Sequence, residues 1–174
     1  MQTKRRILVA LHLFLFLSSL IITIYGVVFG FGVGQRGSML HFGYFKTFTI
    51  DSNVFCGLVS LFVACALMKN KKDLSLPHSL VLLQYAAAVS VGLTVLIVVT
   101  FLAPMGVLAG GSYFTSFAGT TFFFHFFNPI LSGALFVYGS VEEGMGRKEN
   151  FLGTLPMILY AVYYIMTAVI LETM

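Results

Sequence analysis

Polar side chains recur at helical spacing inside strongly apolar segments of this chain. Segment 48–68 contains a series spaced by four, three and four residues: Thr49, Asn53, Cys56 and Ser60. Segment 118–138 contains a second series with the same spacing: Thr121, His125, Asn128 and Ser132. Segment 151–171 adds a third: Tyr160, Tyr164 and Thr167. Each series lies on one face of a helix. Polar groups are costly in lipid unless they meet a partner or a cavity, so we expect the three faces to point toward one another.

The histidines, acidic residues and cysteines of the chain do not form a recognisable metal-binding or redox motif. A bis-histidine haem needs two histidines at similar depth on neighbouring helices, and His125 has no such partner. Asp51 and His125 supply only two ligands for a metal ion. Cys56 and Cys65 are too far apart along one helix for a disulfide, and no CxxC motif is present. We therefore expect no metal and no cofactor.

The composition is that of a membrane protein. Of the 174 residues, 59% are hydrophobic and 9% are charged, whereas soluble domains contain about 25% charged residues. The excess apolar surface is expected to face lipid, because one core of this size could not bury it. The net charge of +4 comes from short basic clusters between apolar segments. This pattern is typical of membrane orientation and not of a nucleic-acid surface, so we expect membrane lipids as partners and no nucleic acid.

Five apolar segments are long enough to span a bilayer as helices, which need about 20 residues. Helix satisfies every backbone group within a single segment, and the segments lack the alternation of a β-barrel. The sequence predicts an all-α transmembrane bundle in one integral membrane domain, residues 1–174, with spans at about 7–31, 48–68, 78–104, 118–138 and 151–171. Loop 105–117 is expected to be a flexible linker; the alternative is a segment that dips into the membrane or covers a cavity. Gly26 and Gly30 form a GxxxG that predicts either a packing seam or a chance match.

Basic residues predict the orientation. Of the ten lysines and arginines, most lie in alternate connections, next to one side of the predicted bundle: Lys4, Arg5, Arg6, Lys69, Lys71, Lys72, Arg147 and Lys148. Arg36 and Lys46 lie in the loop on the other side. The positive-inside rule therefore places the N-terminus in the cytoplasm of a multi-pass cell-membrane protein, and with five spans the C-terminus lies outside.

The polar series then share the outer half of the membrane. Asn53 would lie roughly 7–8 Å from the outer end of its span and His125 roughly 10 Å from the outer end of its own. We expect one pocket open to the outer leaflet, lined by Thr49, Asn53, His125, Asn128, Asp51 and Tyr164. The alternative is a hydrogen-bonded network that only fixes helix packing.

Two of these segments resemble a known family. Residues 48–53, Phe-Thr-Ile-Asp-Ser-Asn, resemble the Phe-Thr-x-x-Ser-Asn signature of bacterial relatives of the androgen-induced family of intramembrane threonine hydrolases. Residues 125–129, His-Phe-Phe-Asn-Pro, resemble the histidine of that family, which is followed at short distance by a proline. The order of the two motifs along the chain is the same.

The resemblance implies hydrolysis of lipid esters such as fatty-acid esters of hydroxy fatty acids. It implies that Thr49 is the nucleophile and His125 the general base. A threonine hydroxyl needs a neighbouring base to become a good nucleophile, and a neutral histidine suits that task. From their chemistry alone, Asn53 or Asn128 could orient the histidine or donate to an oxyanion.

The alternative function belongs to another class. A non-enzymatic membrane protein could use the same polar faces to bind or transport a small amphiphile, or to join a larger membrane complex. A transporter of this size is expected to work as a homo-oligomer, and the chain lacks the internal symmetry common among transporters. A reactive Thr49 favours the enzyme, whereas a continuous polar path to the cytoplasm favours transport.

Overall fold

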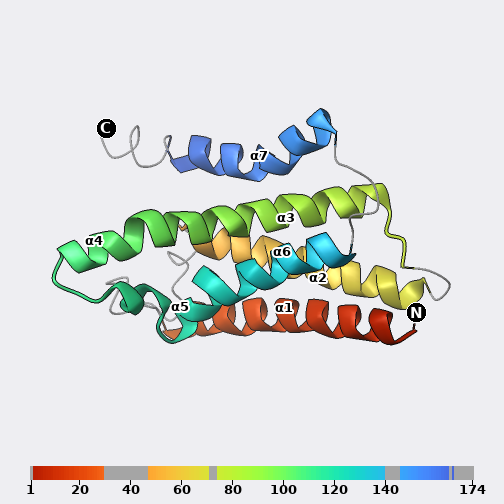
Figure 1. The fold of residues 1–174 in the computed structure, drawn as a ribbon, viewed down its shortest axis with the longest axis horizontal. Helices are drawn as coiled ribbons and strands as arrows, with labels where there is room; N and C mark the ends of the chain where they lie inside the picture. The colour runs from red at the N-terminus through yellow and green to blue at the C-terminus, as the bar shows by residue number, and fades with distance from the viewer. Residues whose placement is uncertain (1, 30–46, 71–73, 140–145, 165, 167–174) are drawn as a thin grey trace.

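The computed structural model describes residues 2–29, 47–70, 74–139, 146–164 and 166, and it is all-α over these residues (Figure 1). The long helices are α1 (Gln2–Phe29), α2 (Phe48–Lys69), α3 (His78–Ile97), α6 (Asn128–Gly139) and α7 (Arg147–Tyr164). The short elements are a π-helical turn (Val98–Leu102), α4 (Ala103–Leu108), a 3-10 helix (Tyr113–Phe117), α5 (Thr120–Phe122) and a second π-helical turn (Phe123–Phe127).

Four helical stretches are long and apolar enough to cross a membrane, which makes the chain a multi-pass membrane protein. They are Gln2–Phe29, Phe48–Lys69, His78–Leu108 and Thr120–Gly139. Each agrees with one of the first four predicted spans to within a few residues. Of the predicted fifth span, α7 covers the part up to Tyr164, and Thr167 lies outside the described residues.

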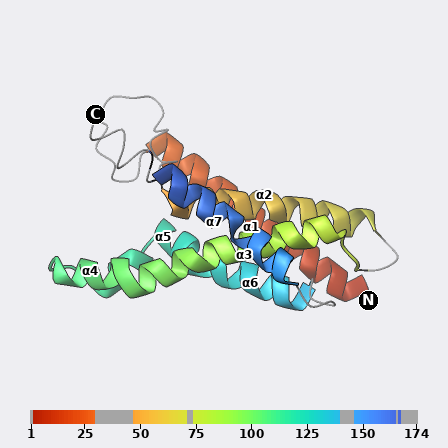
Figure 2. The ribbon, with the colours of Figure 1, turned by 90° about the horizontal axis from the view of Figure 1, so that it is seen from above.

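The long helices alternate in direction (Figure 1). α1 packs on α2, α2 packs on α3, and α3 lies between α2, α6 and α7. Figure 2 shows α7 crossing α3 obliquely. The alternation gathers basic residues at the end of the bundle that holds the start of α1: Lys4, Arg5, Arg6, Lys69, Arg147 and Lys148. Arg36, Lys46, Lys71 and Lys72 lie outside the described residues.

The core has two parts. The larger cluster fills the interfaces of α1, α2, α3 and α6, and its least exposed members include Leu15, Val63, Ala87 and Val91. The smaller cluster lies nearer the opposite end and consists of Ile22, Ile50 and Phe124. The outer surface of each helix is also apolar. Whether an apolar residue is buried therefore depends on the helical face on which it lies and not on its hydropathy.

α1 and α2 approach each other closely at Gly57. A Cβ atom at Gly57 would lie 2.8 Å from Ser19 Cβ, so only glycine fits there. Small residues of this kind let membrane helices pack tightly. Of the predicted GxxxG pair, Gly26 is buried on α1 and Gly30 lies outside the described residues. The seam that the structure describes is therefore the Ser19–Gly57 contact, which the GxxxG search missed.

Both five-residue π-helical turns come shortly before a proline. Val98–Leu102 precedes Pro104, and Phe123–Phe127 precedes Pro129. Proline lacks the N–H that an α-helix needs, and its ring displaces the carbonyl one turn earlier, so the preceding turn widens. A carbonyl in the first π turn is satisfied from outside the helix, because the Tyr113 hydroxyl donates to the Val99 oxygen at 3.0 Å.

The prediction of a flexible linker at 105–117 was wrong for much of that segment. Its first residues continue the long helix as α4, and its last residues form the 3-10 helix Tyr113–Phe117. Ser112 caps this short helix, since its side chain accepts a hydrogen bond from the Phe114 N–H. The segment therefore places a defined carbonyl group, that of Ser116, beside the helix that follows.

Candidate functional site

Two fully buried asparagines connect α2 and α6. Asn128 Nδ2 donates to Asn53 Oδ1 at 3.2 Å, and neither residue is exposed at all. Asparagine amides in an apolar bundle must be paired, because an unpaired donor or acceptor costs about 1–3 kcal/mol. The pair is possible because α2 and α6 run in the same direction with these two residues at one level.

The same amides extend the network to α1. Asn128 Nδ2 also donates to Ser19 Oγ at 3.3 Å, and the Ser18 hydroxyl lies 3.0 Å from Asn128 Oδ1. Asn128 thus uses both N–H groups and its oxygen within the bundle. Three helices that pack without a hydrophobic driving force in lipid are held in register by these directed contacts.

Asn53 makes its remaining contacts with backbone carbonyls. Its Nδ2 donates to the Thr49 oxygen at 2.8 Å and to the Phe124 oxygen at 3.2 Å. Phe124 belongs to the second π turn, whose wider geometry leaves a carbonyl in need of a donor from another helix. One amide nitrogen therefore holds the backbone of Thr49 next to the backbone that immediately precedes His125.

His125 is oriented by the 3-10 helix. Its Nδ1 lies 2.6 Å from the Ser116 carbonyl oxygen. A carbonyl oxygen can only accept, so the proton resides on Nδ1, which donates. In the neutral ring Nε2 is then an acceptor, which is the state that a general base requires. The residue is half-buried.

The register of α2 and α6 would bring the two predicted catalytic residues to one level if both helices were regular. The Cys56 thiol donates to Ser132 Oγ at 3.2 Å. Thr49 and His125 each lie two helical turns before these partners, so regular α-helices would place them face to face. The π turn contains an additional residue and changes this phase, with the result that Phe124 is buried (3% exposed) and His125 turns toward Ser116.

Thr49 is half-buried at the start of α2. No hydrogen bond joins its hydroxyl to the His125 ring among the described residues, although Asn53 links the carbonyl of Thr49 to that of Phe124, the residue before His125. A contact through one bridging water stays a prediction.

The predicted polar face of segment 118–138 was right for Asn128 and Ser132, which are buried, and wrong for Thr121. Thr121 is exposed and donates to the Ala118 oxygen at 2.6 Å. The prediction assumed an uninterrupted α-helix, and the π turn before Pro129 rotates the residues that precede it. Asp51 is half-buried near the start of α2. α7 ends at Tyr164, whose side chain is outside the described part.

Sequence reasoning missed the polar residues of α3 that extend the network, Ser90 and Thr94. Ser52 Oγ lies 3.1 Å from Thr94 Oγ1, and this contact joins α2 to α3. Ser90 and Thr94 are four residues apart on α3 and both are buried, a helical spacing that was available in the sequence. Ser116 contacts His125 through its backbone carbonyl, and no sequence pattern predicts a contact of this kind.

No family model, curated protein or solved structure matches this chain. Within the described ranges, no three His, Cys, Asp or Glu side chains gather as potential metal ligands.

Proposed function

We propose that this protein hydrolyses lipid-like esters in the membrane with Thr49 as nucleophile and His125 as general base. The observation that carries the proposal is the Nδ1 contact of His125 with the Ser116 carbonyl at 2.6 Å, because it leaves Nε2 as the basic atom. The Asn53 amide supports it by holding Thr49 and the residue before His125. The resemblance of residues 48–53 and 125–129 to intramembrane threonine hydrolases adds the reaction class.

The chemistry follows from these two side chains. His125 Nε2 takes the proton of the Thr49 hydroxyl through one water, and Oγ1 attacks the ester carbonyl carbon. The tetrahedral intermediate collapses, the C–O bond to the alcohol breaks, and the alcohol leaves with the proton from Nε2. Water then attacks the acyl-threonine with His125 again as base, which releases the fatty acid and restores Thr49.

Asn53 and Asn128 have a positioning role in this proposal and do not line the substrate pocket. Both are fully buried, and the N–H groups of both amides are already donated within the bundle. An oxyanion would need a donor that is still free to turn toward it. Asp51, which is half-buried on α2, remains a proposed pocket residue together with Tyr164.

We further propose that the N-terminus is cytoplasmic, that α7 begins a fifth span, and that the site opens to the outer leaflet of the cell membrane. The basic residues at the start of α1, the end of α2 and the start of α7 occupy one end of the bundle (Figure 1). The positive-inside rule favours the cytoplasm for that end.

The test is hydrolysis of a long-chain fatty-acid ester by the purified protein in lipid nanodiscs. Thr49→Ala and His125→Ala should each lower the rate by about 10²–10⁴-fold, and the double variant should lose little more, because the pair acts as one unit. Thr49→Ser should retain part of the activity, since the hydroxyl survives. Matched controls are Thr100→Ala and His78→Ala, which alter exposed residues of the same types. Equal rates in Thr49→Ala and the parent protein would refute the nucleophile.

The second candidate is a non-enzymatic protein that binds or transports a small amphiphile, or a subunit of a membrane complex. It is supported by the fully buried Asn53–Asn128 pair, whose hydrogen bond would fix helix packing equally well in a protein that catalyses nothing. If the protein binds the intact ester and releases no fatty acid over many hours, this reading replaces the hydrolase.

A further inference from the structure

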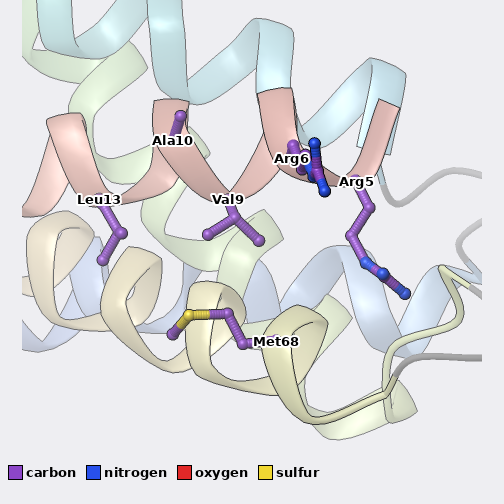
Figure 3. A pocket seen from close by; sticks show the side chains of 6 residues that line it. All are labelled: Arg5, Arg6, Val9, Ala10, Leu13 and Met68. Atoms are coloured by element: carbon purple, nitrogen blue, oxygen red, sulfur yellow. The ribbon is translucent and has the colours of Figure 1, made fainter. Parts of the chain in front are cut away.

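A groove lies between α1 and α2 at the end of the bundle where the basic residues gather (Figure 3). Its volume is about 350 Å³, and it is lined by Arg5, Arg6, Val9, Ala10, Leu13 and Met68. Figure 3 shows Val9 and Leu13 directed from α1 toward Met68 of α2, with Arg5 nearer the start of the helix. The groove is thus cationic at its mouth and apolar along its length.

The arrangement matches an amphiphile with an anionic head. From Arg6 to Leu13 the helix rises roughly 10 Å, so the apolar residues lie below the level of the guanidinium groups. Arginine presents a planar set of donors that fits the oxygens of a phosphate. An acidic soluble partner would contact the arginines but leave the apolar length of the groove uncovered, whereas an acyl chain covers it.

We propose that this groove binds an anionic glycerophospholipid of the leaflet that faces the basic end. Its phosphate lies against Arg5 and Arg6, and one acyl chain lies along Val9 and Leu13 toward Met68. Basic pockets between transmembrane helices on the cytoplasmic side are known to recognise anionic head groups. The site is separate from Thr49 and His125, and it stands whether or not the protein hydrolyses esters.

A second groove on the other side of α1 provides an internal control. It has a volume of about 420 Å³, lies between α1 and α6, and contains Lys4 as its one cationic residue with Leu8, Leu131, Leu135 and Tyr138 among its lining. Lysine is a point charge without the forked donor geometry of arginine. The Lys4 groove should therefore distinguish anionic from zwitterionic lipid less strongly than the Arg5–Arg6 groove.

The absence of tryptophan from the sequence allows a clean test. Met68→Trp places a fluorophore in the Arg5–Arg6 groove, and Tyr138→Trp places one in the Lys4 groove. Each protein is reconstituted in vesicles that contain brominated phosphatidylglycerol or brominated phosphatidylcholine in otherwise identical lipid. Bromine quenches tryptophan on contact, so the two quenching curves report the relative affinity of the groove for each lipid.

We expect phosphatidylglycerol to quench Met68→Trp more strongly than phosphatidylcholine does. Adding Arg6→Gln, which alters an exposed side chain, should reduce that preference about fivefold, and adding Arg5→Gln as well should remove it. Lys4→Gln should leave it unchanged. Equal quenching by the two lipids, an equal loss in Lys4→Gln, or displacement by inorganic phosphate would each overturn the proposal, the last because a free anion would then be the ligand.

Discussion

Asn53 of α2 and Asn128 of α6 share a hydrogen bond of 3.2 Å in a place where neither side chain is exposed. Through Ser19 on one side and the Phe124 carbonyl on the other, this pair connects α1, α2 and the π turn that precedes α6. The two amides therefore connect the helices of the bundle beside Thr49, whose carbonyl oxygen accepts a hydrogen bond from Asn53.

We predict that Asn53→Leu and Asn128→Leu each lower the melting temperature of the protein in detergent, and that the double variant loses less than the sum. Each single change leaves buried partners without a hydrogen bond, whereas the double change removes both. The coupling energy should be about 0.6–1.7 kcal/mol. Phe62→Leu, at a position that is 56% exposed, is the control. Additive losses would mean that the two amides act independently.

Gly57→Ala should destabilise the bundle because the new Cβ atom would lie 2.8 Å from Ser19 Cβ and force α1 away from α2. The expected loss is about 1–3 kcal/mol. Gly133→Ala on α6 is the matched control, since a Cβ there meets nothing within 4 Å. Thermal unfolding of both variants measures the difference. A melting temperature for Gly57→Ala equal to that of the control would show that the two helices can separate at no cost.

His12→Leu should leave the protein as stable as the parent or make it more stable. His12 is 2% exposed in the core, and its Nδ1 has no hydrogen-bond partner among the described residues. Removing an unpaired buried polar atom relieves a cost of about 1–3 kcal/mol. Leu15→Ala, at a neighbouring core position that is 1% exposed, should instead cost about 2–5 kcal/mol. A loss in His12→Leu as large as that in Leu15→Ala would show that the imidazole has a partner which stabilises the fold.

The proposed orientation predicts labelling from opposite sides of the membrane. In a background with Cys56→Ala and Cys65→Ala, an impermeant maleimide should reach Ser112→Cys in intact cells and Asn70→Cys only after lysis. Ser112 is exposed between α4 and the 3-10 helix, and Asn70 follows α2 at the basic end. Labelling of Asn70→Cys in intact cells would reverse the orientation.

The sequence alone determined that the chain crosses a membrane as helices and where four of those helices lie. The reason is that a bilayer imposes one requirement on every span, a continuous apolar length with internally paired backbone, and hydropathy records it directly. For example, the observed helix α2, Phe48–Lys69, agrees with the predicted span 48–68 to within one residue. Helical periodicity in the sequence also predicted that Asn53, Asn128 and Ser132 lie on inward faces. All three are buried, because this periodicity holds wherever the helix is regular.

Only the tertiary structure decided that Phe124, and not His125, is buried on the inner face of the fourth span. The π turn before Pro129 buries Phe124 and turns His125 toward the Ser116 carbonyl, and periodicity of 3.6 residues does not extend through such a turn. The contacts of Ser19 and Gly57 could not be predicted from the sequence either. A serine or glycine in an apolar helix shows its role only through the helix that faces it, and that pairing is set by the packing of the whole bundle.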